Sequence, residues 1–203
     1  ARPAGPVAYL GEFLTQFFNN YYIGGAVMAL LLTLFMLLCY YVVRRFAPAA
    51  SRYISLAIAA IPLISLLLFL GNPDVTLTFV VALIIVMGGT CWFVSIAKPA
   101  TLFVGMILVT ALLYWLAGPA TIIFSLLAIA WCFKCQGTTV ALNAIFSLVA
   151  LAWLAANIWI WSAFISYPVS YQLIGVRYAM MPDTFYTGLF VTEALCVLAP
   201  LAA

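Results

Sequence analysis

Three arginines, Arg44, Arg45 and Arg52, stand between two long apolar runs at residues 22–43 and 53–70. A helix of about 20 apolar residues is long enough to cross the hydrocarbon core of a bilayer, which is roughly 30 Å thick. Two such runs joined by a short loop therefore predict a helical hairpin across a membrane. Because cytoplasmic loops carry an excess of Lys and Arg, the loop also predicts which way the hairpin points.

Composition extends this prediction to the whole chain. Hydrophobic residues make up 69% of the 203 residues and charged residues only 5%, whereas soluble domains are about 25% charged. The apolar runs lack the alternating pattern of a membrane β-barrel, so we expect an all-α, polytopic transmembrane helical bundle. The net charge of +3 comes from few residues and predicts no nucleic-acid partner.

Turn-forming residues divide the chain into a single domain of about seven spans. The separators contain Pro73, Pro99, Gly118 and Gly137, which favour turns over helix interiors. The predicted spans are residues 22–43, 53–70, 76–96, 101–117, 120–133, 138–164 and 185–201.

Alternate connections carry most of the positive charge. After the arginine loop, the next connections on the same side hold Lys98 and Lys134, while Arg2 and Arg177 fall on the opposite side. Five of the seven basic residues thus share one side, which predicts that this side is cytoplasmic and that the N-terminus lies outside. The chain begins without Met and ends on an uncharged apolar segment, so we expect a part of a longer polypeptide.

Residues 6–21 carry an amphipathic pattern. Large apolar side chains, from Leu10 to Tyr21, fall within about 140° of a helical surface, whereas Glu12, Gln16 and Asn19 align on another face. This pattern predicts a helix lying in the outer membrane interface, with a bend into the first span at Gly24-Gly25. Either the helix only anchors the bundle, or Glu12 acts as a general base beside Gln16 and Asn19 in a substrate site.

The second outer segment, residues 166–187, contains Arg177 and Asp183. The planar guanidinium of Arg177 suits recognition of a phosphate, with Asp183 as a supporting catalytic carboxylate. The alternative is structural: Arg177 pairs with Asp183 or with lipid headgroups.

Three polar residues fall within predicted spans: Glu193, Asn157 and Asn143. An ionisable group inside a membrane is costly, so Glu193 is a functional candidate unless it has a paired structural role. The asparagines suit hydrogen bonds between helices, or a polar path across the membrane.

The sequence predicts no metal site and no cofactor. It contains no His, and Cys132 and Cys135 form an isolated pair without a second one. We find no nucleotide-binding or hydrolase motif either.

The opening segment, with Tyr9-Leu10-Gly11-Glu12-Phe13-Leu14 followed by Gly24-Gly25, resembles a family of uncharacterised polytopic membrane proteins of Bacteroidota. The resemblance covers residues 1–45 and implies a multi-pass protein of the bacterial inner (plasma) membrane. The general layout is also similar to the C-type membrane glycosyltransferases, which transfer sugars from polyprenyl-phosphate donors. That resemblance implies a carboxylate role for Glu12 and a phosphate role for Arg177, although the usual acidic pair is reduced here to Glu12 alone.

Three hypotheses remain open at this point. The first is an outward-facing enzyme domain that acts on a lipid-linked sugar. The second is a transporter or a subunit of a transport complex, and the third is a non-catalytic assembly subunit with membrane partners. All three have membrane lipid as a partner.

Overall fold

The computed structural model describes residues 4–71, 76–96, 99–135, 140–165 and 186–202. Within these ranges the chain is helical and contains no strand, which confirms the all-α class. The elements are α1 (Gly5–Thr15), η1 (Gln16–Asn19), α2 (Tyr21–Phe46), α3 (Arg52–Leu70), α4 (Leu77–Phe93), α5 (Pro99–Ala117), η2 (Gly118–Ala120), α6 (Thr121–Cys135), α7 (Val140–Ile165) and α9 (Tyr186–Ala202). Each range predicted as a span thus contains a helix.

Local chemistry explains where several helices begin. Asn20 and Ser51 adopt extended backbone conformations, and their side chains accept hydrogen bonds from Tyr22 N and Ile54 N, at 3.1 and 3.3 Å. Such side-chain caps satisfy backbone donors that a helix leaves unpaired. Between α5 and α6, Gly118 has φ 67°, a left-handed conformation that glycine adopts at little cost and that ends α5.

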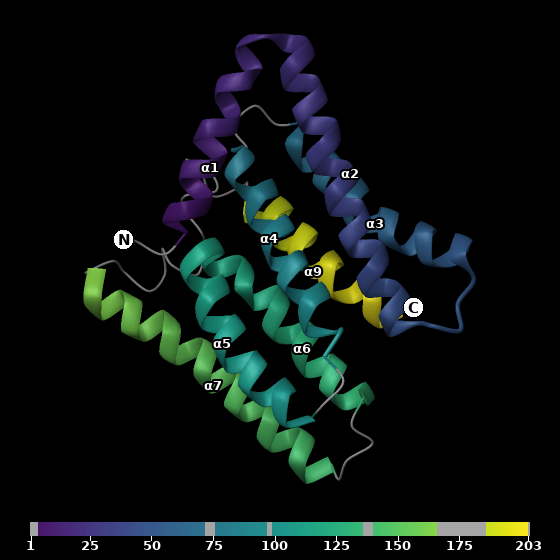
Figure 1. The fold of residues 1–203 in the computed structure, drawn as a ribbon, viewed down its shortest axis with the longest axis vertical. Coiled ribbons are helices and arrows are strands. Elements are labelled where there is room, and N and C mark those ends of the chain that lie inside the picture. Colours follow the sequence, from purple (N-terminus) through teal and green to yellow (C-terminus); the bar gives the residue numbers. More distant parts are fainter. Residues whose placement is uncertain (1–3, 72–75, 97–98, 136–139, 166–185, 203) are drawn as a thin grey trace.

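The predicted bend at Gly24-Gly25 is wrong. Both glycines lie inside α2, and the chain turns instead at Asn20, after the 3-10 turn η1. Figure 1 shows α1 and α2 meeting at this sharp bend. The cap at Asn20 explains the position, because its side chain starts the new helix. Gly24 has another role: a Cβ there would lie 3.0 Å from Phe18 Cα, so glycine permits the close approach of η1.

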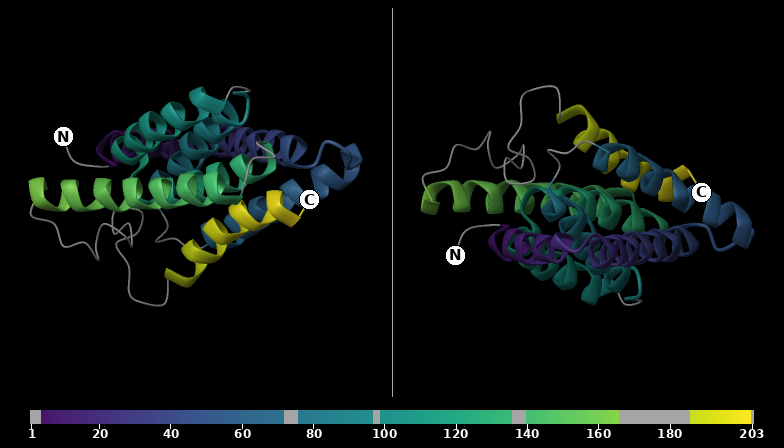
Figure 2. Two further views of the ribbon diagram at one scale, coloured as in Figure 1. Left: turned by 90° about the horizontal axis from the view of Figure 1, so that it is seen from below. Right: turned by 90° about the horizontal axis from the view of Figure 1, so that it is seen from above.

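Helix α4 lies at the centre of the bundle. It contacts α1, α2, α5 and α6, and most of its side chains are buried, including Phe79, Leu83 and Val86, while Trp92 near its end is 56% exposed. Figure 2 shows α3 and α9 side by side along one flank, with α5 on the opposite flank. The core of the described part of the chain is therefore organised around one helix.

The outer helices present apolar side chains outward. Leu30 on α2 is 65% exposed, Leu68 on α3 is 78% exposed and Leu148 on α7 is 68% exposed. By length and composition, three helical stretches are apolar enough to cross a membrane: Tyr21–Phe46, Arg52–Leu70 and Leu102–Lys134. The third stretch includes the turn at Gly118. Shorter apolar helices cover Leu77–Phe93, Ala144–Ile160 and Gly188–Ala202.

Contacts between helix ends show how the helices run. The last residues of α2, α6 and α9 line one groove, and the hydroxyl of Tyr41, near the end of α2, lies 2.9 Å from Ser95 Oγ, just after α4. These four helices therefore finish together. We call this the basic end, because it also carries Arg44, Arg45, Arg52 and Lys134. Elsewhere, Gly188 at the start of α9 packs on Phe69 at the end of α3, so these two helices run antiparallel.

Candidate functional site

The polar stripe predicted on residues 6–21 is exposed. Glu12 lies on α1 and Gln16 and Asn19 lie on η1, all three accessible. Residues three apart eclipse one another in a 3-10 helix, so the turn keeps Gln16 and Asn19 on one side. Thr15 Oγ1 donates to the carbonyl of Glu12 at 2.6 Å, which adds a side-chain bond to the last turn of α1. The Glu12 carboxylate therefore sits on an outer surface of the molecule.

A stripe of small residues positions α1. Ala4, Val7 and Gly11 are buried, at roughly one-turn spacing, and α1 contacts α4 and α5 along its length. A Cβ on Gly11 would lie 2.8 Å from Thr78 Cα and 2.9 Å from Thr78 N, so only glycine fits at this contact. The backbone N–H of Ala4 donates to Trp115 O at 3.1 Å. The aromatic face that suggested an interfacial helix, including Phe13 and Phe17, stays exposed.

The remaining outer candidates lie outside the described residues. Arg177 and Asp183 fall in residues 166–185, and the convergence of Glu12 with Arg177 stays a prediction. Asn143 lies on α7, where its side chain is likewise not described.

Glu193 lies on α9 at the edge of the face that packs on α3. Its side chain is half-buried, whereas the neighbouring Thr192 is fully buried. Thr192 Oγ1 donates to Gly188 O and lies 2.9 Å from Ser65 Oγ on α3. The site of Glu193 is thus beside a polar contact between two helices, which fits either a structural role or a polar path.

Asn157 is buried on α7 but bonds within its own helix. Its Nδ2 donates to Trp153 O at 2.8 Å, and the contact between helices comes from Trp153, whose Nε1 donates to Ile107 O on α5 at 2.9 Å. The predicted interhelical bond of Asn157 is therefore made by its neighbour one turn earlier.

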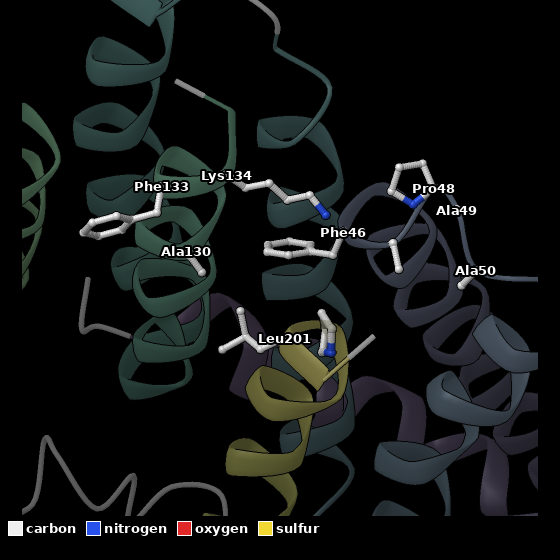
Figure 3. A pocket seen from close by; sticks show the side chains of 10 residues that line it. Phe46, Pro48, Ala49, Ala50, Ala130, Phe133, Lys134 and Leu201 are labelled. Atoms are coloured by element: carbon white, nitrogen blue, oxygen red, sulfur yellow. The ribbon is translucent and has the colours of Figure 1, made fainter. Parts of the chain in front are cut away.

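The sequence did not predict the groove at the basic end. Its volume is about 750 Å³, and it lies between the α2–α3 loop, the end of α6 and the end of α9 (Figure 3). The lining residues are Phe46, Ala47, Pro48, Ala49, Ala50, Ala130, Phe133, Lys134, Pro200 and Leu201. Nine of these ten are apolar or proline, so among the described lining residues Lys134 is the only charged one.

Aromatic contacts hold Lys134 at the groove. Its Nζ lies 5.8 Å from the centre of the Phe46 ring, and Figure 3 shows the side chain reaching from α6 toward that ring. Phe46 is in turn fixed by Trp131, with ring centres 5.3 Å apart. A cation over a ring face is attracted by about 0.5–1 kcal/mol at an exposed site. The ammonium therefore has a preferred position beside the loop.

The arginines of the basic end have separate contacts. Arg44 Nη1 donates to Ala50 O at 2.7 Å, which ties the loop back to α2. Arg45 donates from Nε and Nη2 to the Tyr41 hydroxyl at 3.1 and 2.9 Å. Because Ser95 Oγ donates to Cys91 O at 2.8 Å, the Tyr41 hydroxyl can donate to Ser95. Arg45 is thus linked to the end of α4.

One signal for this groove was present in the sequence. Lys134 and the arginine loop were both assigned to the same side of the membrane, since they fall on alternate connections. That assignment does not predict that the loop after α2 and the end of α6 lie next to each other. The contact between Lys134 and Phe46 requires the ends of α2 and α6 to come together, and this follows from the packing of both helices against α4 and α9.

Comparison with protein families identifies a relationship over the whole chain. A family of unknown function, DUF6057, matches residues 1–203. The chain belongs to this family. Membership of an uncharacterised family is therefore confirmed, and the family match covers residues 1–203 rather than 1–45 alone, while the resemblances to Bacteroidota proteins and to C-type glycosyltransferases stay predictions. No curated protein and no solved structure matches the chain.

Proposed function

We propose that the DUF6057 chain is a multi-pass membrane domain whose role is assembly: it packs against other membrane subunits. The observation that carries this proposal is that apolar side chains cover the outside of the bundle as well as its core. Helix α4 is enclosed by protein, whereas α2, α3 and α7 present Leu and Ile outward. Soluble proteins rarely expose contiguous apolar patches of this kind, because water disfavours them.

Close helix contacts support the same proposal. In a membrane the hydrophobic effect does not drive helices together, so small residues that allow close packing become important. Gly11 on Thr78, Gly89 on Leu113 and Gly188 on Phe69 are contacts of this type, each with an atom of the partner residue less than 3.0 Å from the position of a Cβ. They join α1, α4, α5, α3 and α9, which suits a stable scaffold.

Two buried hydroxyls, those of Thr90 and Ser125, also favour a scaffold over a polar path, whereas the buried Thr121 Oγ1 has no hydrogen-bond partner among the described residues. Thr90 Oγ1 donates to Val86 O and Ser125 Oγ to Thr121 O, each four residues back in its own helix. Such groups are satisfied within the helix and leave little to bind a solute.

The orientation follows from the basic end. Since Lys and Arg mark the cytoplasmic side, the ends of α2, α4, α6 and α9 face the cytoplasm and the N-terminus lies outside. In this arrangement seven helices, α2 to α7 and α9, cross the bacterial inner membrane and alternate in direction.

Cysteine labelling tests embedding and orientation together. Asn19→Cys and Ala49→Cys are made separately in a variant whose five native cysteines are replaced. A membrane-impermeant maleimide added to spheroplasts should label position 19, and should label position 49 only after permeabilisation. The reverse pattern would overturn the orientation. Release of the protein from membranes by alkaline carbonate would overturn the membrane proposal itself.

An enzyme acting on a lipid-linked, polyprenyl-phosphate sugar is the second candidate. The observation in its favour is that Glu12 on α1 and Gln16 and Asn19 on the following turn η1 are all exposed. Glu12→Gln keeps size and hydrogen bonding but removes the base. It should abolish sugar transfer at a normal level of folded protein, and unchanged transfer would exclude this role of Glu12.

A transporter remains the third candidate, on the observation that Glu193 lies beside the Ser65–Thr192 contact. Glu193→Gln should then reduce solute uptake by membrane vesicles, with Glu12→Gln as the matched control. Equal uptake by both variants and the parent protein would exclude a coupling role for Glu193.

A further inference from the structure

We propose that the groove at the basic end binds the phosphate headgroup of an anionic membrane phospholipid. This inference rests on the proposed membrane embedding and adds a ligand to it. The groove is formed by three segments distant in sequence: residues 46–50, 130–134 and 200–201. Its volume, about 750 Å³, is within the range of small-molecule sites, roughly 300–1,000 Å³.

Charge selects the class of ligand. Lys134 is exposed, and none of the ten described lining residues is acidic, so this described part of the wall offers a cation and no carboxylate. The Lys134 ammonium has three N–H donors. Its contact with the Phe46 ring is not a hydrogen bond and leaves these donors able to bind an acceptor. A phosphate oxygen placed at the groove would accept these donors and neutralise the charge.

The apolar walls select an amphiphile over a soluble anion. Phe133 is 49% exposed and Leu201 is 50% exposed, and both border the groove beside Lys134. On the same helices, Leu126 lies two turns before Phe133 and Leu198 one turn before Leu201, and both are exposed. An acyl chain of a lipid can lie on such surfaces while its headgroup reaches the lysine.

The position in the fold fits the same ligand. The groove lies at the ends of three helices, where apolar surface gives way to the basic loop. Basic pockets between helices on the cytoplasmic side are known to bind anionic headgroups. The bond from Arg44 to Ala50 O fixes the loop that forms one wall, so the site is largely formed before a ligand arrives.

Native mass spectrometry of the full-length protein tests the proposal. The protein is purified in mild detergent and mixed with phosphatidylglycerol or, separately, with phosphatidylcholine. Phosphatidylglycerol should bind preferentially, and Lys134→Gln should lower its affinity about fivefold, the factor that corresponds to about 1 kcal/mol per basic residue. Lys134→Arg should retain binding.

Arg52→Gln is the matched control, because Arg52 lies at the same end but does not line the groove. It should leave the affinity unchanged. An equal loss of affinity in the Arg52 and Lys134 variants would show that general surface charge attracts the lipid, and it would overturn the proposal. Displacement of the lipid by millimolar inorganic phosphate would identify a site for free anions instead.

Alkaline carbonate extraction distinguishes failure of the lipid-binding proposal from failure of the proposed membrane embedding. If the protein resists alkaline carbonate extraction but shows no preference for phosphatidylglycerol, the groove proposal fails and the membrane domain stands. If carbonate releases the protein, both proposals fail.

Discussion

Helices α3 and α4 have similarly apolar sequences but opposite surroundings. On α4, Leu83 and Val86 are buried, and almost the entire surface of the helix contacts other helices. On α3, Ile61, Ile64 and Leu68 face outward, and the helix packs only against α2 and α9 among its major contacts. Apolar sequence alone therefore does not distinguish a helix enclosed by protein from one that presents a face outward.

The difference arises from what each helix offers its neighbours. Gly89 lets α5 approach α4, and the α4 backbone at Thr78 accepts Gly11 of α1. Helix α3 receives one comparable contact, from Gly188 of α9 on Phe69 near its end. Close approach from several directions encloses α4, while α3 keeps one side open.

The largest effect is expected from truncating the enclosed helix. Leu83→Ala should lower the free energy of unfolding by about 2–5 kcal/mol, because it leaves a cavity in a packed core. Leu68→Ala is the matched change on α3 and should have a much smaller effect, since lipid can fill the space. Unfolding in a titration with denaturing detergent measures both, and similar losses would contradict the contrast.

A charge on the open side of α3 tests whether that side meets lipid. Ile61→Arg, near the middle of α3, should reduce membrane insertion by about 2.5–3.5 kcal/mol. Tyr53→Arg, at the start of the helix, should be tolerated because the side chain reaches the interface. The fraction of protein that inserts measures the effect. If Ile61→Arg changes nothing, then α3 faces water or an aqueous cavity.

The close contact of α1 with α4 can be broken by one methyl group. Gly11→Ala should destabilise the protein by about 1–3 kcal/mol, because the new Cβ would overlap the Thr78 backbone. Gly25→Ala is the control: no atom lies within 4 Å of a Cβ there, and alanine favours a helix. Detergent unfolding of the two variants should therefore give shifts of opposite sign. Equal shifts would show that α1 does not dock at Thr78.

The smallest effect concerns the polar link between α3 and α9. Removing the Ser65–Thr192 contact by Ser65→Ala should cost about 0.6 kcal/mol, a typical value for hydrogen bonds between membrane helices. A double-mutant cycle with Thr192→Val isolates the pair. A coupling energy of zero would mean that Thr192 is satisfied by Gly188 O alone.

The lengths of the apolar runs and the turn residues between them predicted the helices well. Gly118, Asn20 and Ser51 act locally, through their own backbone conformation or a bond two or three residues away. The bend at Gly24-Gly25 was predicted wrongly, because a pair of glycines permits a bend but does not require one. The amide side chain of Asn20 was the stronger signal, since it starts α2.

The site was less predictable than the helices. Exposure of Glu12, Gln16 and Asn19 agrees with the polar stripe, yet their use as an enzyme site stays a prediction. The groove around Lys134 was not predicted, because Phe46, Lys134 and Leu201 are far apart in sequence. Their meeting depends on which helices pack together.

The sequence by itself determined the helical class, most helix boundaries and the grouping of basic residues on alternate connections. These properties follow from hydropathy, capping and charge, which act over a few residues. Only the tertiary structure decided that α4 is enclosed, that Gly11 meets Thr78 and that Lys134 lies over Phe46. Such contacts depend on the shapes of side chains on different helices, and hydropathy contains no information about shape.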